Sequence, residues 1–438
     1  MGLQDVISAD RIHIAFFGMR NTGKSSLVNG VTGQSLSVVS PVKGTTTDPV
    51  KKAMELLPLG PVLIIDTPGL DDQGTLGQLR IQKTKQILAQ TDIAVLVADC
   101  RTGLLPEDEK LIQAFQEKQL PYIIVYNKAD LLETELPESE SPGDTQGSHT
   151  QIKGCPLGCK EEKEGRFPSS PAAREHAPLY TSAVTGQGIH QLKEALGSLS
   201  QKLKKNNPLI SDLLEPGDMV VLVMPIDESA PKGRLILPQQ MTLREILDAH
   251  CIGIACQDGE LKTTLQSLER KPRLVITDSQ VFRKIAPDIP KEIPLTSFSI
   301  LMARYKGTLK DLVRGAALLA QLRDGDKVLI SEGCTHHRQC NDIGTVKMPR
   351  WIKEFSGGKP DFTFSSGGGF PDDLSPYKLI IHCGGCMLSE KEMQHRIGKA
   401  KETEIPIVNY GIAIAQMNGI LKRALQPFPD MAALLDSF

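Results

Sequence analysis

The chain has 438 residues, of which 40% are hydrophobic and 23% charged, and its formal net charge is −2 at pH 7. This length corresponds to about three domains, and the balanced charge disfavours a dedicated nucleic-acid binder. We expect no membrane span, because no run of 18 uncharged apolar residues occurs, and we find no secretory signal. The nine cysteines favour a reducing compartment over a disulfide framework, so we expect the cytoplasm or an equivalent reducing organelle compartment.

Alternating strand and helix patterns organise the first 206 residues. Short apolar runs predict four buried strands, at 11–18, 61–69, 92–100 and 121–130. Helical sequence separates the later runs, as at 106–118. Such alternation is typical of a parallel sheet wrapped by helices, so we expect an α/β domain over residues 1–206.

Residues 132–178 interrupt this pattern. They are rich in Glu, Ser, Pro and Gly and poor in apolar residues, which predicts a surface insertion. Cys155 and Cys159 lie inside it. Two thiols at this spacing could bind a metal, but we interpret them as isolated thiols. A helix at 189–204 then completes the domain.

The segment 18–25, GMRNTGKS, has the spacing of a P-loop. Its glycines let backbone N–H groups turn toward the β-phosphate, and the N-terminus of the following helix favours negative charge there. We expect Lys24 to contact the β- and γ-phosphates and the Ser25 hydroxyl to bind Mg²⁺. The residues expected to bind the nucleotide here are Gly18, Asn21, Thr22, Gly23, Lys24, Ser25 and Ser26.

Three further segments, each after a strand, complete a guanine-nucleotide site. Residues 66–69 (DTPG) supply a carboxylate for Mg²⁺ and a glycine N–H for the γ-phosphate. In 127–130 (NKAD), Asp130 is placed to accept from guanine N1 and the exocyclic amino group, and 181–183 (TSA) offers a backbone contact to the guanine carbonyl. All lie where open α/β sheets bind ligands. The residues expected to act here are Asp66, Gly69, Asn127, Lys128, Asp130, Ser182 and Ala183.

This domain resembles the translation-factor-related small GTPases, in particular the tRNA-modification GTPase branch. Residues 44–48 (GTTTD) resemble the switch I segment of that branch, usually GTTRD. This implies that Thr46 is a Mg²⁺ ligand, with Thr45 and Thr47 as the alternatives, and that it acts with Lys24, Asp66 and Gly69 in catalysis. Leu70 replaces the water-orienting glutamine of Ras-like proteins, so we expect slow hydrolysis. Asn21 stands where potassium-activated members carry asparagine, which implies stimulation by K⁺; a turn-capping role is the alternative.

Residues 210–265 predict a small β-rich middle domain. The apolar runs 218–227 and 233–240 predict a long hairpin, and 251–259 a third strand. So few strands are marginal in isolation. We therefore expect a dimerisation domain and a homodimer, with packing against flanking domains of the same chain as the alternative.

From residue 270 to 438 strands and helices alternate again, which predicts a C-terminal α/β domain. Cys334 follows the run KVLISEG and Cys383 follows KLIIH, so both lie at the carboxyl ends of candidate parallel strands. If these strands are neighbours, their loops converge, and Cys386 bends back in a Gly-Gly turn. With His336 and His382 beside them, three thiolates could hold Zn²⁺ or a 4Fe–4S cluster with one replaceable ligand.

The order Cys-x-His, about 45 residues, then His-Cys-x-x-Cys behind a GTPase domain resembles the FeFe-hydrogenase maturation GTPases of the HydF family. The segment 225–240 also resembles that family's middle domain. The resemblance implies a 4Fe–4S cluster on Cys334, Cys383 and Cys386 in a cluster-binding domain, with His336 and His382 matching the motif histidines. It further implies a scaffold and carrier for the di-iron precursor of the hydrogenase active site, which receives material from two radical-SAM maturases and delivers it to apo-hydrogenase.

Two other functions compete with this one. An RNA-modification or ribosome-assembly GTPase with a structural zinc domain fits the GTPase half equally well, but the balanced charge disfavours a nucleic-acid partner. A redox GTPase would need a fully cysteine-ligated cluster, whereas three cysteines lie in the matched segments. We therefore expect a GTPase scaffold, in which GTP changes the switch loops at 40–50 and 69–80 and so biases partner binding.

Overall fold

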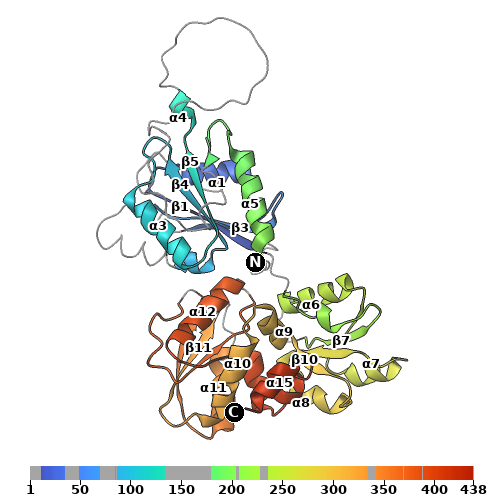
Figure 1. Cartoon of the computed structure of the whole chain (residues 1–438). Coiled ribbons are helices and arrows are strands. Elements are labelled where there is room, and N and C mark those ends of the chain that lie inside the picture. Colours follow the sequence, from blue (N-terminus) through green and yellow to red (C-terminus); the bar gives the residue numbers. More distant parts are fainter. Residues whose placement is uncertain are drawn as a thin grey trace, which may run out of the picture. The chain divides into compact units, whose positions relative to one another are not determined.

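The computed structural model describes residues 11–34, 49–69, 84, 86–133, 179–203, 207–226, 235–333, 342–367, 369–386 and 388–437. They belong to two compact units, residues 11–204 and 205–438 (Figure 1). Within the described ranges, no helix is both long and apolar enough to cross a membrane.

The N-terminal unit is a six-stranded sheet with helices on both faces (Figure 1). Its strands are β1 (Ile12–Phe17), β2 (Val50–Leu56), β3 (Gly60–Asp66), β4 (Ile93–Asp99), β5 (Tyr122–Asn127) and β6 (Leu179–Tyr180). Its helices are α1 (Lys24–Thr32), α3 (Pro106–Glu117), α4 (Asp130–Glu133) and α5 (Ile189–Leu203). The strand order is β2-β3-β1-β4-β5-β6, and all pairs are parallel except the β2–β3 pair.

The central strands of this sheet are buried on both sides, as their continuous apolar sequence predicts. Every residue of β4 is buried. Side chains of α1 and α5 pack on one face and those of α3 on the other. The predicted α/β class and the four predicted strands are confirmed, and the antiparallel edge strand β2 adds to them.

The C-terminal unit contains two four-stranded parallel sheets. The first has the order β10-β9-β7-β8 and the second β12-β11-β13-β14. The strands are β7 (Met219–Val223), β8 (Ile252–Cys256), β9 (Leu274–Thr277), β10 (Leu295–Ser297), β11 (Lys327–Glu332), β12 (Asp361–Ser366), β13 (Leu379–His382) and β14 (Ile407–Asn409). The α-helices are α6 (Leu237–Asp248), α7 (Leu261–Ser267), α8 (Phe282–Ile285), α9 (Phe298–Tyr305), α10 (Leu309–Ala316), α11 (Met348–Ser356), α12 (Glu390–Glu402), α13 (Tyr410–Met417), α14 (Leu421–Ala424) and α15 (Pro429–Leu435).

The hairpin predicted for 218–227 and 233–240 is wrong. Strand β7 pairs in parallel with both β8 and β9, and residues from Leu237 onward form helix α6. A proline in the first turn favours a helix start, and Gln239 accepts a hydrogen bond from the Ile236 backbone N–H at 3.1 Å. The middle segment is therefore an α/β layer in place of the expected β-rich one.

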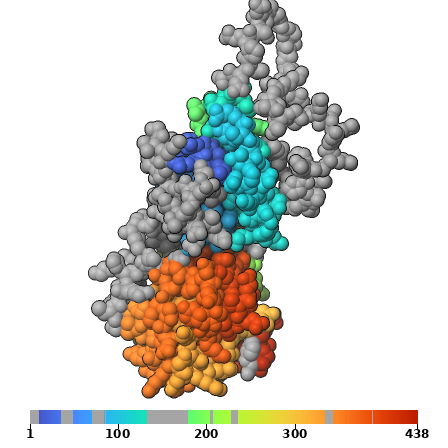
Figure 2. Space-filling view, turned by 90° about the vertical axis from the view of Figure 1, so that its left-hand side faces the viewer, coloured from blue at the N-terminus to red at the C-terminus, as the bar shows by residue number. Residues whose placement is uncertain are grey.

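The middle sheet also extends beyond residue 265, where we expected its domain to end. Strands β9 and β10 complete it, so residues near 270–297 belong with β7 and β8. One continuous apolar core joins this sheet to the last one, from Leu209 to Phe428. The space-filling view shows the orange and red segments of this unit as closely packed (Figure 2). Packing within the chain thus supplies the core that so few strands lack.

Candidate functional site

The P-loop closes around the side chain of Lys24. Gly18 and Gly23 both have positive φ, and a Cβ atom at Gly18 would lie 2.2 Å from the Val97 carbonyl oxygen. The loop conformation therefore requires glycine. Lys24 Nζ donates to the carbonyl oxygens of Gly18 at 2.9 Å and Met19 at 2.6 Å. The ammonium is thus held inside the loop, where a P-loop binds phosphates.

Ser25 and Asp66 form the candidate Mg²⁺ site. The Ser25 hydroxyl donates to Asp66 Oδ2 at 2.6 Å. The other carboxylate oxygen, Oδ1, is buried and has no hydrogen-bond partner among the described residues. Such an oxygen fits a hard cation that takes oxygen ligands. Thr46, the expected third ligand, lies outside the described residues, as does Leu70.

Gly69 brings the DTPG segment against the P-loop. A Cβ atom at this position would lie 2.8 Å from Cα of Arg20. Because backbone cannot move aside as a flexible side chain can, only glycine permits this approach. The two segments expected to share the γ-phosphate therefore lie side by side.

Asn127 connects three of the predicted nucleotide segments. Its Nδ2 donates to the Thr22 carbonyl oxygen at 3.0 Å. Its Oδ1 accepts from the Thr181 hydroxyl and from the Ala183 backbone N–H, both at 3.3 Å. The P-loop, the NKAD segment and the TSA segment are thus brought together by one buried amide.

Asp99 is a residue of this site that the sequence analysis missed. It accepts from Lys128 Nζ at 2.8 Å and binds Arg101 through both carboxylate oxygens, at 3.1 and 2.9 Å. The Arg101 guanidinium and Lys128 hold the pKa of the Asp99 carboxyl well below its usual range. Its position at the end of β4, between two strands that carry nucleotide segments, was the available signal.

The remaining residues predicted to bind the nucleotide lie around this framework. Asn21 is exposed in a left-handed conformation with φ of 63°, and Ser26 is partly buried in the first turn of α1. Asp130 begins α4. The Ser182 hydroxyl oxygen accepts from the backbone N–H groups of Val184 and Thr185, at 3.2 and 3.1 Å.

The candidate metal centre lies where β11 and β13 end. These strands are parallel neighbours, with Ser331 opposite His382, as convergence of the cysteine loops requires. The Gly333 backbone N–H donates to Cys383 Sγ at 3.0 Å. Cys334 and His336 lie outside the described residues, but Cys334 is bonded directly to Gly333.

The cysteine turn (residues 383–386) has donors that fit a soft metal or an iron–sulfur cluster. Cys383 Sγ accepts from the backbone N–H groups of Gly333 and Gly385, and such hydrogen bonds stabilise cluster thiolates. Burial raises the pKa of the Cys383 thiol, so metal binding there must displace a proton. Within the described residues, no three His, Cys, Asp or Glu side chains form a metal-binding group.

His382 is fully buried, and both of its ring nitrogens bind protein groups. Nε2 lies 2.9 Å from Arg396 Nη1 and Nδ1 lies 2.7 Å from the Cys383 carbonyl oxygen. A guanidinium can only donate, so Nε2 accepts and Nδ1–H donates. Burial and the charge of Arg396 lower the pKa of His382 to about 3. The neutral ring thus orients the carbonyl at the start of the cysteine turn.

Arg396 is a second residue that no motif predicted. It is 1% exposed. Its Nε donates to Glu392 Oε1 at 2.9 Å, its Nη2 donates to the Gly367 carbonyl oxygen at 2.7 Å, and its guanidinium lies over the Phe370 ring. The salt bridge between Arg396 and Glu392, within α12, therefore fixes the guanidinium that binds His382 at the start of the cysteine turn.

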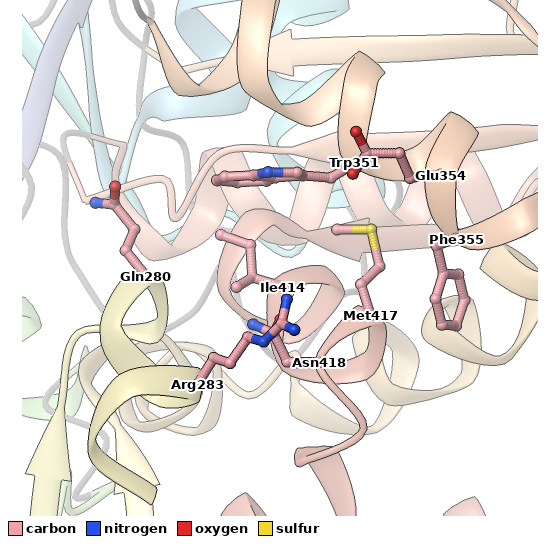
Figure 3. Close-up of a pocket in the computed structure, with 8 residues that line it drawn as sticks. All are labelled: Gln280, Arg283, Trp351, Glu354, Phe355, Ile414, Met417 and Asn418. Atoms are coloured by element: carbon pink, nitrogen blue, oxygen red, sulfur yellow. The ribbon is translucent and has the colours of Figure 1, made fainter.

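A separate cavity of about 480 Å³ lies in the C-terminal unit, between residues 280–283 and helices α11 and α13 (Figure 3). Its walls combine Trp351, Phe355 and Met417 with the charged side chains of Arg283 and Glu354. None of the described residues that line it is a cysteine. This cavity is therefore distinct from the cysteine turn.

Family models match three segments of the chain. The hydrogen maturase F dimerization domain matches residues 209–307, the hydrogen maturase F tetramerization domain matches 310–427, and a 50S ribosome-binding GTPase model matches 13–128. The chain belongs to the hydrogen maturase F (HydF) family. The N-terminal unit of this HydF chain is a GTPase domain.

Curated relatives and solved structures are similar to parts of this HydF chain. GTPase Der of Wolinella succinogenes is 33% identical over 201 residues, which cover 45% of the chain and 37% of that protein. The tRNA modification GTPase MnmE of Nitrosospira multiformis is 29% identical over 203 residues, 44% of the chain and 38% of that protein. The chain thus spans less than two fifths of either relative. The crystal structure of Aquifex aeolicus Era aligns with a TM-score of 0.31 and 19% identity over 56% of this chain and 92% of that chain.

Proposed function

We propose that this HydF chain is a GTP-binding and GTP-hydrolysing scaffold that carries the di-iron subcluster of FeFe-hydrogenase. It would hold a 4Fe–4S cluster whose fourth ligand can be exchanged. The observation that carries this proposal is the hydrogen bond from Gly333 to Cys383 Sγ. It brings Gly333, the residue that precedes Cys334 in the sequence, to the cysteine turn, and the same chain has a GTPase domain.

In the GTPase domain, Lys24 would contact the β- and γ-phosphates, and Asp130 would select guanine. Ser25, Asp66 and Thr46 would hold Mg²⁺, which neutralises charge on the phosphate oxygens. The Gly69 backbone N–H would bind the γ-phosphate. Hydrolysis is expected to be slow, because Leu70 cannot orient water.

K⁺ is the proposed activator of this hydrolysis. Asn21 is exposed on the P-loop, so its side-chain oxygen is free of the core and could reach a cation at the phosphates. Replacement of KCl by NaCl at equal ionic strength is expected to slow GTP hydrolysis, and Asn21→Ala is expected to remove the difference. Equal rates in both salts would leave Asn21 with a structural role only.

In the C-terminal unit, Cys334, Cys383 and Cys386 would ligate the cluster. A cluster with three cysteine ligands has one site open to exchange. The carried precursor would bind and leave at this site. His382 would orient the turn, since its ring nitrogens already bind Cys383 and Arg396. His336 stays a candidate for the fourth position.

The proposed assembly is a homodimer formed through the middle sheet. Strand β8 is at an edge of that sheet, and it exposes Ile252 by 47%, while the neighbouring Leu247 on α6 is 56% exposed. An exposed apolar edge strand is a template for pairing with a second chain. This agrees with the dimerization-domain match over residues 209–307. The further partners would be apo-hydrogenase and two radical-SAM maturases, in the cytoplasm or an equivalent reducing compartment.

The test is anaerobic reconstitution with iron and sulfide, followed by hydrogenase activation. The wild-type protein is expected to turn brown, with broad absorption near ~400 nm from the cluster, and to activate apo-hydrogenase. Cys334→Ser, Cys383→Ser and Cys386→Ser should each lose the cluster and the activation. If Lys24→Ala still activated apo-hydrogenase, the nucleotide would have no part in the proposed function.

The competing function is an RNA-modification or ribosome-assembly GTPase with a structural zinc site. The same preparation separates the two functions. Colourless protein with one zinc per chain, insensitive to iron and sulfide, would support the zinc protein and contradict the carrier role.

A further inference from the structure

A buried lysine lies beneath the cysteine turn. Lys306 caps the C-terminus of α9 and is 3% exposed. Its Nζ donates to the carbonyl oxygen of Gly385, and to that of Leu388 at 3.0 Å. Gly385 lies between Cys383 and Cys386, so the ammonium binds the backbone of the turn itself. Lys306 belongs to the segment matched by the dimerization domain, whereas the cysteines belong to the next domain.

The Gly385 peptide determines the shape of the turn. Gly385 has φ of +60°, and a Cβ atom there would lie 2.6 Å from Met393 Sδ. Its N–H donates to Cys383 Sγ at 3.4 Å, while its carbonyl oxygen accepts from Lys306. The N–H and the carbonyl belong to the two peptide units that meet at Gly385, so Lys306 holds the peptide unit that leads to Cys386, next to the one that donates to the sulfur.

The end of α9 that carries Lys306 is itself anchored. Arg304 donates to the carbonyl oxygens of Pro208 and Leu209, at 3.1 and 3.2 Å, and forms an ion pair with Asp212. The ammonium is therefore presented by a fixed helix end.

The charge of Lys306 is as relevant as its hydrogen bonds. A buried ammonium is unfavourable unless negative groups compensate it. Thiolates and an iron–sulfur cluster at the turn carry net negative charge, which increases by one on reduction. A positive charge beside the turn stabilises the reduced form more than the oxidised form.

We propose that Lys306 is a positioning residue for the cysteine turn, and that its buried ammonium also raises the reduction potential of the cluster held there. The second part rests on the proposed cluster function. The first part concerns the metal-free protein and does not.

The test compares Lys306→Met, which removes the charge at similar length, with Lys306→Arg, which keeps it. Lys399→Met is the control, because Lys399 likewise donates to a backbone carbonyl oxygen of the last domain, that of Pro371, and its ion pair is with Asp372, outside the turn. In metal-free protein, amide hydrogen exchange of residues 383–388 is expected to speed up about tenfold or more in Lys306→Met and to stay unchanged in the control.

After reconstitution, the ratio of reduced to oxidised cluster at a fixed applied potential is the second measurement. Lys306→Met should lower this ratio about tenfold, which is a shift of about 59 mV for one electron. Lys306→Arg should stay close to wild type, because the charge remains. Fluorescence of Trp351, the single tryptophan of the chain, checks that each variant is folded. Lys306→Gln replaces Lys306→Met if the latter does not fold.

Unchanged exchange at 383–388 in folded Lys306→Met would overturn the positioning role. Equal potential shifts in Lys306→Arg and Lys306→Met would overturn the electrostatic role. A wild-type protein that takes up no iron and sulfide would instead contradict the proposed function, while the exchange measurement would still decide whether Lys306 holds the turn.

Discussion

The nucleotide site and the cysteine turn are built at the same kind of place but are held together differently. Both lie where parallel strands of an α/β sheet end. In the nucleotide site, the residues that join the loops belong mainly to the motifs, as Lys24 and Asn127 show, and Asp99 is the exception. Around the cysteine turn, the holding residues are Lys306 and Arg396, which lie outside the motif.

This difference follows from the chemistry of the two ligands. Phosphate is bound by backbone N–H groups of one contiguous loop, so a short segment contains most of its own site. A cluster needs thiolates from separate loops and compensation for their charge. Those contributions come from side chains that only the fold brings together. Four predictions test this contrast, from the largest expected effect to the smallest.

Removal of Arg396 tests most strongly whether residues outside the motif hold the cysteine turn together. Arg396→Met leaves Glu392 and His382 buried without their partner, and breaking a buried ion pair in this way costs about 3–5 kcal/mol. We expect the C-terminal unit to unfold at lower denaturant concentration, followed by Trp351 fluorescence. Arg350→Met is the control, because its pair with Glu354 is exposed. Equal losses in both variants would show that the buried network adds nothing to stability.

Lys24→Ala tests whether the nucleotide site depends on its own motif residue. The variant would lose the proposed contact between Lys24 and the transferred phosphate, so kcat for GTP hydrolysis is expected to fall about 10²–10³-fold. Lys110→Ala, on the exposed face of α3, should retain the wild-type rate. Steady-state phosphate release measures both. Normal turnover by Lys24→Ala would show that Lys24 does not bind the phosphates of GTP.

The pair Gly23→Ala and Gly33→Ala tests whether close packing of the P-loop against Asn127 matters in the same site. Both glycines flank α1 with positive φ, so the backbone strain is common to both. Only at Gly23 would the new Cβ approach Asn127 Nδ2, at 2.3 Å, whereas at Gly33 nothing lies within 4 Å. We expect Gly23→Ala to weaken GDP binding by an extra ~1–3 kcal/mol, typical of overpacking, in titration calorimetry. Similar affinities would mean that Asn127 moves freely.

Asp99→Asn tests the charged residue that supports Lys128. Because the folded-state pKa of Asp99 lies below its ordinary value, its contribution is present above the unfolded value and is lost as pH falls below it. We expect the variant to lower the unfolding free energy of the GTPase domain by about 1 kcal/mol at pH 7. The difference from wild type should shrink between about pH 4 and pH 2. Denaturant titrations at several pH values measure it, and a constant difference would contradict the assignment.

The middle domain shows where sequence patterns fail. The run GRLILPQQ has apolar residues that suit either a strand or the start of a helix, and short runs cannot be distinguished by periodicity alone. The segment forms a helix. Pro238 lies in its first turn, and its buried residues continue at helical spacing to Ile246, where they pack against the sheet. The sequence also did not predict that β9 and β10 extend the middle sheet, because strands of three or four residues are too short to show a clear hydrophobic pattern.

The sequence by itself determined the GTPase domain and the placement of two cysteine segments after two strands, because each is encoded in a contiguous run with its own spacing. Only the tertiary structure decided that β11 and β13 are neighbours, that the middle sheet shares a core with the last one, and that Lys306, Arg396 and Asp99 support the sites. Buried charges act on groups that are close in space. Their partners are distant or unmarked along the chain, so no local pattern reveals them.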